Sequence, residues 1–133
     1  MNTPNPTAEK SYAFALRMIK LGRFLREEKA EYDMSKQVLR SGTSIGAKVE
    51  EALGGHSRKD FKHKRTISYK EARETHYWLP LLRDSGFIEG DSAESLLTGC
   101  DELLKIIGST LITLKKMMMS NHIFHFFSLR SYF

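Results

Sequence analysis

Apolar residues recur at helical spacing in four separate segments of the chain, and this periodicity constrains the fold more than any other feature. In the first segment the intervals are four, three and four residues, which is the spacing of one helix face: Phe14, Met18, Leu21 and Leu25. No segment alternates apolar and polar residues with period two, and neither Asn-Gly nor Asp-Gly marks a hairpin. The pattern therefore predicts an all-α fold.

The residues that flank the periodic segments predict where the helices begin and end. Ser57 with Asp60, and Asp91 with Glu94, have the spacing of a helix-capping box. Four helices joined by short loops favour an antiparallel up-down-up-down bundle. The predicted helices cover about residues 8–29, 33–53, 57–85 and 91–118.

Both ends of the chain depart from this pattern. Residues 1–7 contain Pro4 and Pro6 and are predicted to be a disordered lead, which leaves a bundle domain at about residues 8–119. Residues 120–133 form an aromatic C-terminal tail whose apolar side chains follow no helical period. Two interpretations of the tail stay open: an extension outside the functional domain, or a cover for an apolar seam between subunits.

The cysteine content and the N-terminus predict a cytoplasmic protein. Cys100 is the only cysteine, so no intramolecular disulfide can form. The first ten residues have neither a basic start nor an apolar stretch for export. No segment reaches the roughly 18 uninterrupted apolar residues that span a bilayer. We therefore expect no membrane partner.

One short segment matches the sequence of a catalytic serine motif but not the secondary structure that the motif requires. GTSIG at residues 42–46 matches the G-x-S-x-G nucleophile elbow, which requires a strand before the serine and a helix after it. Helix is predicted on both sides here. Gly42 and Gly46 each destabilise a helix interior by about 1 kcal/mol relative to alanine, which suggests that another helix packs closely there. Ser44 is accordingly predicted to be a small residue at a helix contact.

Other polar clusters have structural explanations. No Glu is followed by His at the third position, so the di-metal motif of four-helix bundles is missing. His56, Asp60 and His63 have near-helical spacing, but such sets on charged helices are usually solvated. Glu71 and Glu74 resemble an acid/base pair, although nearby cations favour ion pairs. We predict no catalytic residue, metal or cofactor, and we expect Cys100 in the core.

Basic residues concentrate in the third predicted helix. Residues 57–85 contain eight Lys and Arg but four Asp and Glu. A row of cations suits phosphate groups, and a tyrosine among them suits stacking on an unpaired base. A solvated face that keeps the protein soluble is the equally weighted alternative. The predicted basic stripe lies away from the apolar face of this helix and comprises Arg58, Lys62, Arg65, Tyr69, Arg73 and His76.

Two blocks of sequence suggest a family. They are SKQVLRSGTSIGAKVEEALGGHSRKDF at residues 35–61 and SYKEARETHYWLPLLRDSGFI at residues 68–88. The blocks resemble the four-helix-bundle proteins encoded in intervening sequences of bacterial 23S ribosomal RNA genes. That family is similar to the accessory variability determinant of diversity-generating retroelements, a basic bundle protein that partners a reverse transcriptase and nucleic acid. The resemblance implies a ring-like homopentamer and no catalytic residue, since a shared fold does not supply an activity.

Three hypotheses about function follow. The first is a non-enzymatic, oligomeric protein that binds RNA or DNA through the basic stripe, with a reverse transcriptase as a further partner. The second is a protein–protein interaction scaffold without a nucleic-acid role. The third is a metal-dependent bundle enzyme, which metal analysis of the purified protein would test.

Overall fold

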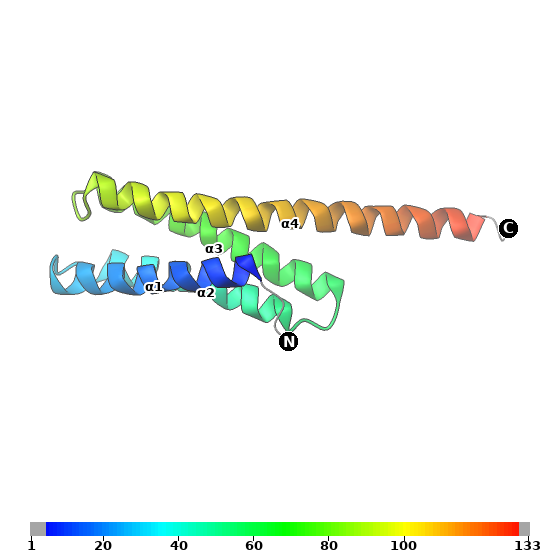
Figure 1. Cartoon of the computed structure of the whole chain (residues 1–133), viewed down its shortest axis with the longest axis horizontal. Helices are drawn as coiled ribbons and strands as arrows, with labels where there is room; N and C mark the ends of the chain where they lie inside the picture. The colour runs from blue at the N-terminus through cyan, green and yellow to red at the C-terminus, as the bar shows by residue number, and fades with distance from the viewer. Residues whose placement is uncertain (1–4, 131–133) are drawn as a thin grey trace.

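Four helices make up the part of the chain that the computed structural model describes, residues 5–130, with side chains described for residues 5–121. No strand occurs among these residues, so the predicted all-α four-helix fold is confirmed. Successive helices run in opposite directions (Figure 1). They are α1 (Pro6–Glu27), α2 (Asp33–Leu53), α3 (Arg58–Asp84) and α4 (Gly90–Arg130).

Side-chain caps fix the start of α1 and α3. The Ser57 side chain accepts a hydrogen bond from the Asp60 backbone N–H at 3.0 Å, which confirms the predicted cap of α3. The Asn5 side chain accepts from the Ala8 N–H at 3.1 Å, and Pro6 occupies the first helical position, where its missing N–H is tolerated. The prediction of a disordered lead is therefore wrong for residues 6 and 7, while residues 1–4 lie outside the described part.

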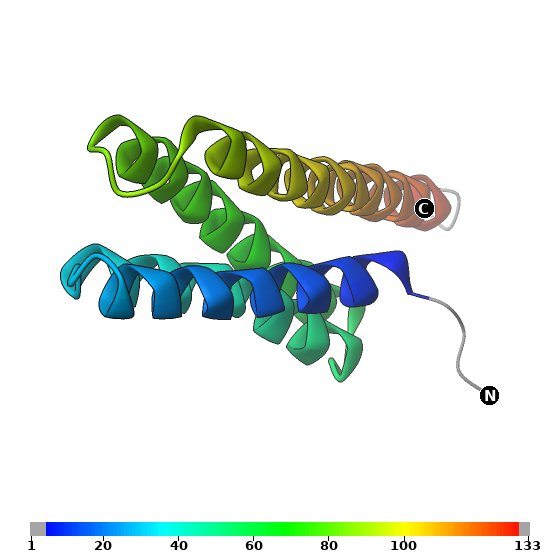
Figure 2. The ribbon, with the colours of Figure 1, turned by 60° about the vertical axis from the view of Figure 1, so that its left-hand side comes forward.

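The fourth helix is longer than the sequence pattern predicts. We expected it to end near residue 118, but α4 continues to Arg130 and includes most of the predicted tail. The segment after Gly108 contains no glycine or proline, so nothing in the backbone terminates the helix. The C-terminal part of α4 consequently extends past the ends of the other three helices (Figures 1 and 2). Residues 131–133 lie outside the described part.

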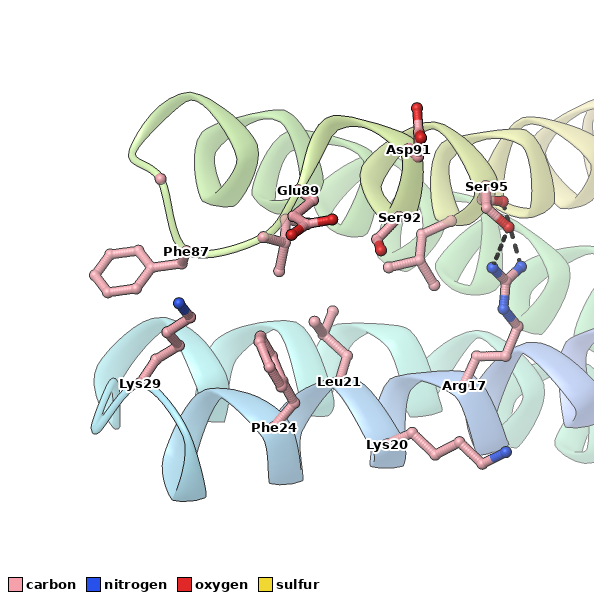
Figure 3. Close-up of a pocket in the computed structure, with 13 residues that line it drawn as sticks. Arg17, Lys20, Leu21, Phe24, Lys29, Phe87, Glu89, Asp91, Ser92 and Ser95 are labelled. Atoms are coloured by element: carbon pink, nitrogen blue, oxygen red, sulfur yellow. Dashed lines mark hydrogen bonds between the residues drawn. The ribbon is translucent and has the colours of Figure 1, made fainter.

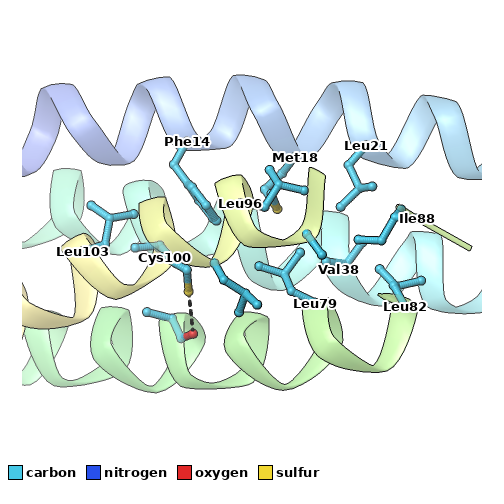
Figure 4. Close-up of a cluster of buried hydrophobic side chains, with 14 of the residues drawn as sticks. Phe14, Met18, Leu21, Val38, Leu79, Leu82, Ile88, Leu96, Cys100 and Leu103 are labelled. Atoms are coloured by element: carbon cyan, nitrogen blue, oxygen red, sulfur yellow. Dashed lines mark hydrogen bonds between the residues drawn. The ribbon is translucent and has the colours of Figure 1, made fainter. Parts of the chain in front are cut away.

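One apolar core runs between the four helices (Figure 4). The predicted inner face of α1 is confirmed, because all four of its predicted core residues are buried. Several hydroxyl groups within the core are hydrogen-bonded: Ser68 donates to the Ile45 carbonyl at 2.8 Å, and Thr75 donates to Ser41 at 2.9 Å. No helix in the described residues is both long and apolar enough to cross a membrane.

Cys100 is a core residue, as predicted. Its side chain is fully buried, and its thiol donates to the Ala72 carbonyl at 3.3 Å. Burial raises the pKa of this thiol to about 12. We therefore expect Cys100 to resist alkylation by iodoacetamide at pH 8 in the folded protein and to react fully in urea, because only the exposed thiolate is nucleophilic. Mass spectrometry measures both; rapid labelling of the native protein would contradict this burial.

Two glycines allow α1 and α2 to approach closely, which confirms the predicted helix contact. A β-carbon added at Gly42 would lie 2.7 Å from Sδ and 3.1 Å from Cβ of Met18. One added at Gly46 would lie 3.3 Å from the Ser11 carbonyl oxygen. Ser44 is half-buried, and its hydroxyl donates to the Arg40 carbonyl of its own helix at 2.6 Å.

Candidate nucleic-acid interface

The predicted basic stripe faces α4. Asp101 of α4 pairs with His76 at 3.0 Å, and a β-carbon at Gly108 would lie 3.3 Å from the Tyr69 ring. Tyr69 is half-buried and packs against the core. The expectation that the whole stripe is free for a partner is therefore wrong, because α4 docks on this side of α3.

Arg65 departs most from that expectation. Its side chain is only 5% exposed, and its Nε and Nη1 atoms have no hydrogen-bond partner among the described residues. The guanidinium lies 5.1 Å from the centre of the Phe61 ring. Burial lowers the pKa of Arg65, because it disfavours the charged form. Arg65 therefore belongs to the core and cannot reach a phosphate in this structure.

The cations at the start of α3 remain accessible. Arg58 and Lys59 are exposed, and Lys62 is half-buried. His63 is exposed beside them, and Arg73 is exposed about three turns further along α3. Within the described residues, none of these five side chains forms an ion pair.

Carboxylates of α2 and α3 form ion pairs with cations other than those at the start of α3. Arg40 of α2 pairs with Glu71 at 3.1 Å and also with Glu74, and the Trp78 indole donates to Glu74 at 3.1 Å. This network confirms ion pairing for the two glutamates, although the cation comes from α2.

Glu51 of α2 forms a second such site. It pairs with Lys48 at 3.0 Å and with Lys64 at 3.3 Å. Hydrogen bonds from these two lysines lower the pKa of Glu51. With Glu51 engaged, Arg58, Lys59 and Lys62 leave the start of α3 with an excess of positive charge, which suits an anionic partner.

The described residues contain no group of three or more His, Cys, Asp and Glu side chains that could hold a metal ion. His56 and His63 are both exposed, and Asp60 lies one turn after the Ser57 cap.

A groove of about 710 Å³ lies between α1 and the first turns of α4 (Figure 3). Leu21, Phe24 and Leu96 supply apolar lining, and Arg17 closes one end by donating to the Ser95 hydroxyl at 2.7 Å. The periodicity does not reveal this groove, because its shape depends on how the loop before α4 folds back over α1. Phe24 is 40% exposed, so it leaves apolar surface uncovered in this groove.

Comparisons with known proteins agree with this architecture. A family model described as 23S rRNA-intervening sequence protein matches residues 5–109. The chain is also similar to a protein with unknown function from the S23 ribosomal protein family of Bacteroides thetaiotaomicron, whose crystal structure is known. The two sequences are 45% identical, and the two structures superpose with a TM-score of 0.78. The match covers 79% of this chain and 94% of that one. No curated protein matches the sequence. Since the family model covers most of the chain, this protein belongs to the 23S rRNA-intervening sequence protein family.

Proposed function

We propose that this chain is a non-enzymatic, cytoplasmic protein that assembles into oligomers and binds RNA or DNA through the start of α3. One observation carries the proposal: Arg58, Lys59 and Lys62 have no ion-pair partner among the described residues, while Glu51 of α2 is paired with Lys48 and Lys64. Phosphate groups are the natural counter-charge for such a cluster, because their binding releases condensed counterions.

Oligomerisation would strengthen a weak contact of this kind. Three cations on one subunit give modest affinity, but a homopentamer of the ring-like type implied by the resemblance presents five such clusters. Once one cluster is bound, the others engage the same strand at high effective concentration. A reverse transcriptase is a further proposed partner on the same ground of resemblance.

Replacing the three cations with Arg58→Ala, Lys59→Ala and Lys62→Ala is expected to weaken nucleic-acid binding about tenfold or more. Loss of up to three phosphate contacts should also reduce the slope of log K against log salt by up to about 2 for a single strand. Fluorescence anisotropy of a labelled RNA and a DNA of the same sequence, measured across a salt series, gives both quantities.

The matched control removes the same charge elsewhere. Arg23, Lys20 and Lys36 are exposed on α1 and α2, and their replacement by alanine should change affinity about threefold at most. Equal losses in the two triple variants would show that net charge alone acts. No binding by the wild-type protein at low salt would contradict the proposed function.

A protein–protein scaffold is the second candidate, and two observations favour it. The groove beside Phe24 is partly apolar, and α4 exposes Ile112 and Met119 in its C-terminal half. A pull-down that recovers a stoichiometric protein partner after nuclease treatment would support this candidate, whereas loss of all partners on nuclease treatment would favour nucleic-acid binding.

A further inference from the structure

The groove between α1 and the start of α4 leaves apolar side chains accessible (Figure 3). Leu21 and Phe24 of α1 point toward the opening, and Phe87 lies at the end opposite Arg17. Phe24 is 40% exposed, and Phe87 is half-buried. A groove of about 710 Å³ has the size of a binding site for several side chains. An amphipathic helix is the kind of partner that lays apolar residues into such a groove.

The α4 side of this groove is acidic. Residues 84–94 contain four Asp and Glu but no Lys or Arg. Glu89 lines the groove, is exposed and forms no ion pair with a described residue. On the opposite wall, Arg17 is hydrogen-bonded to α4, Lys20 points away from α4, and Lys29 lies 5.8 Å from the centre of an aromatic ring of α1. The unpaired carboxylate therefore suits a positively charged partner.

The C-terminal half of α4 has the complementary character. Its Ile112 and Met119 side chains are 60% and 55% exposed. Lys115 and Lys116 lie between them, are exposed and form no ion pair with a described residue. Residues 103–130 contain four Lys and Arg but no Asp or Glu. This part of α4 is therefore a positively charged helix with uncovered apolar surface.

The two complementary surfaces cannot meet within one chain. Leu96 lines the groove, and Met119 lies on the same helix, about 35 Å further along at 1.5 Å per residue. The helix is continuous from Gly90 to Arg130, and it does not fold back on itself (Figures 1 and 2). A contact between the groove and the C-terminal half of α4 therefore requires a second copy of the chain.

We propose that the C-terminal half of α4 docks in the groove of a second copy, with apolar residues against Phe24 and lysines beside Glu89. This inference rests on the oligomeric assembly in the proposed function and identifies the two surfaces that form it. Each copy offers one groove and one helix, so the contact is head-to-tail. Contacts of this type build a ring where the rotation between copies closes, and a filament where it does not.

Phe24→Lys and Ile19→Lys are the matched variants that test the groove. The two side chains are 40% and 41% exposed on the same helix, but only Phe24 lines the groove. A lysine at position 24 removes apolar contact surface and repels the lysines of the docked helix. We expect Phe24→Lys to raise the Kd of self-association about tenfold or more, and Ile19→Lys to change it about threefold at most. Sedimentation equilibrium measures both values.

Cross-linking tests which surfaces meet. Ser92 lines the groove, Met119 lies on the docking helix, and Ser109 is an exposed position between them on α4. Protein with Ser92→Cys is mixed with protein carrying Met119→Cys, treated with a short bismaleimide and analysed by mass spectrometry. We expect linked dimers from this mixture and few from a mixture of Ser109→Cys with Met119→Cys. The buried Cys100 thiol does not compete.

The outcomes separate the docking from the rest of the proposed function. Dimers linked through Met119→Cys alone would show that two α4 ends pair with each other, which would overturn the docking. Equal effects of the two lysine variants, with no preference in cross-linking, would overturn it while leaving assembly intact. A wild-type protein that stays monomeric at every concentration would overturn both docking and assembly, whereas its binding of RNA and DNA is measured independently by the salt series.

Discussion

Replacement of Gly42 by valine is expected to lower the free energy of unfolding by about 3 kcal/mol. Even the first atom of a side chain at this position would lie 2.7 Å from Sδ and 3.1 Å from Cβ of Met18. Met18 is fully buried, so it cannot move into solvent to make room. Overpacking of this kind typically destabilises a protein by about 1–3 kcal/mol, and the better helix propensity of valine offsets less than about 1 kcal/mol. Urea unfolding at a fixed protein concentration measures the change.

Gly90→Val is the matched control for this experiment. A β-carbon at Gly90 meets no atom within 4 Å, and Gly90 is also helical. Its replacement should change the free energy of unfolding by less than about 0.5 kcal/mol. A second variant, Gly42→Val with Met18→Ala, makes room on α1 and should be less destabilised than the sum of the single changes. Strict additivity would show that Met18 is not the group that the valine strikes.

The α1–α2 contact was predictable because its cause is local in the sequence. Two glycines one turn apart, in a helix that has apolar residues on two sides, have few explanations other than close helix packing. The inner face of α1 was predictable for a similar reason, since the spacing of its apolar residues alone defines it. These features required no knowledge of how the helices are arranged around one another.

The burial of part of the basic stripe could be predicted only from how the helices are arranged around one another. Periodicity separates the apolar face of α3 from the rest, but it does not say on which side of that face α4 docks. The half-buried Tyr69 and the pair between His76 and Asp101 result from that choice. The predicted end of α4 was wrong for another reason. The irregular apolar spacing of the last residues predicted that the helix ends near residue 118, but no glycine or proline after Gly108 terminates it.

Replacement of Arg65 by methionine is expected to raise the free energy of unfolding by about 2 kcal/mol. The Arg65 side chain is 5% exposed, and its Nε and Nη1 atoms lack hydrogen-bond partners among the described residues. A buried charge without a partner loses its hydration and gains little in return, and apolar replacement of buried charged groups often stabilises by about 1–4 kcal/mol. Methionine also has a similar length and can keep a contact with the Phe61 ring through its sulfur.

The gain depends on filling the space as well as on removing the charge. Arg65→Ala should therefore bring no stabilisation, because truncation leaves a cavity between α3 and the core. Arg58→Met, at an exposed position of the same helix, should change the free energy of unfolding by less than about 0.5 kcal/mol. A loss of stability in Arg65→Met, measured by urea unfolding at one protein concentration, would mean that the contact with Phe61 outweighs desolvation. A higher free energy of unfolding would instead show that the buried charge of Arg65 destabilises the fold.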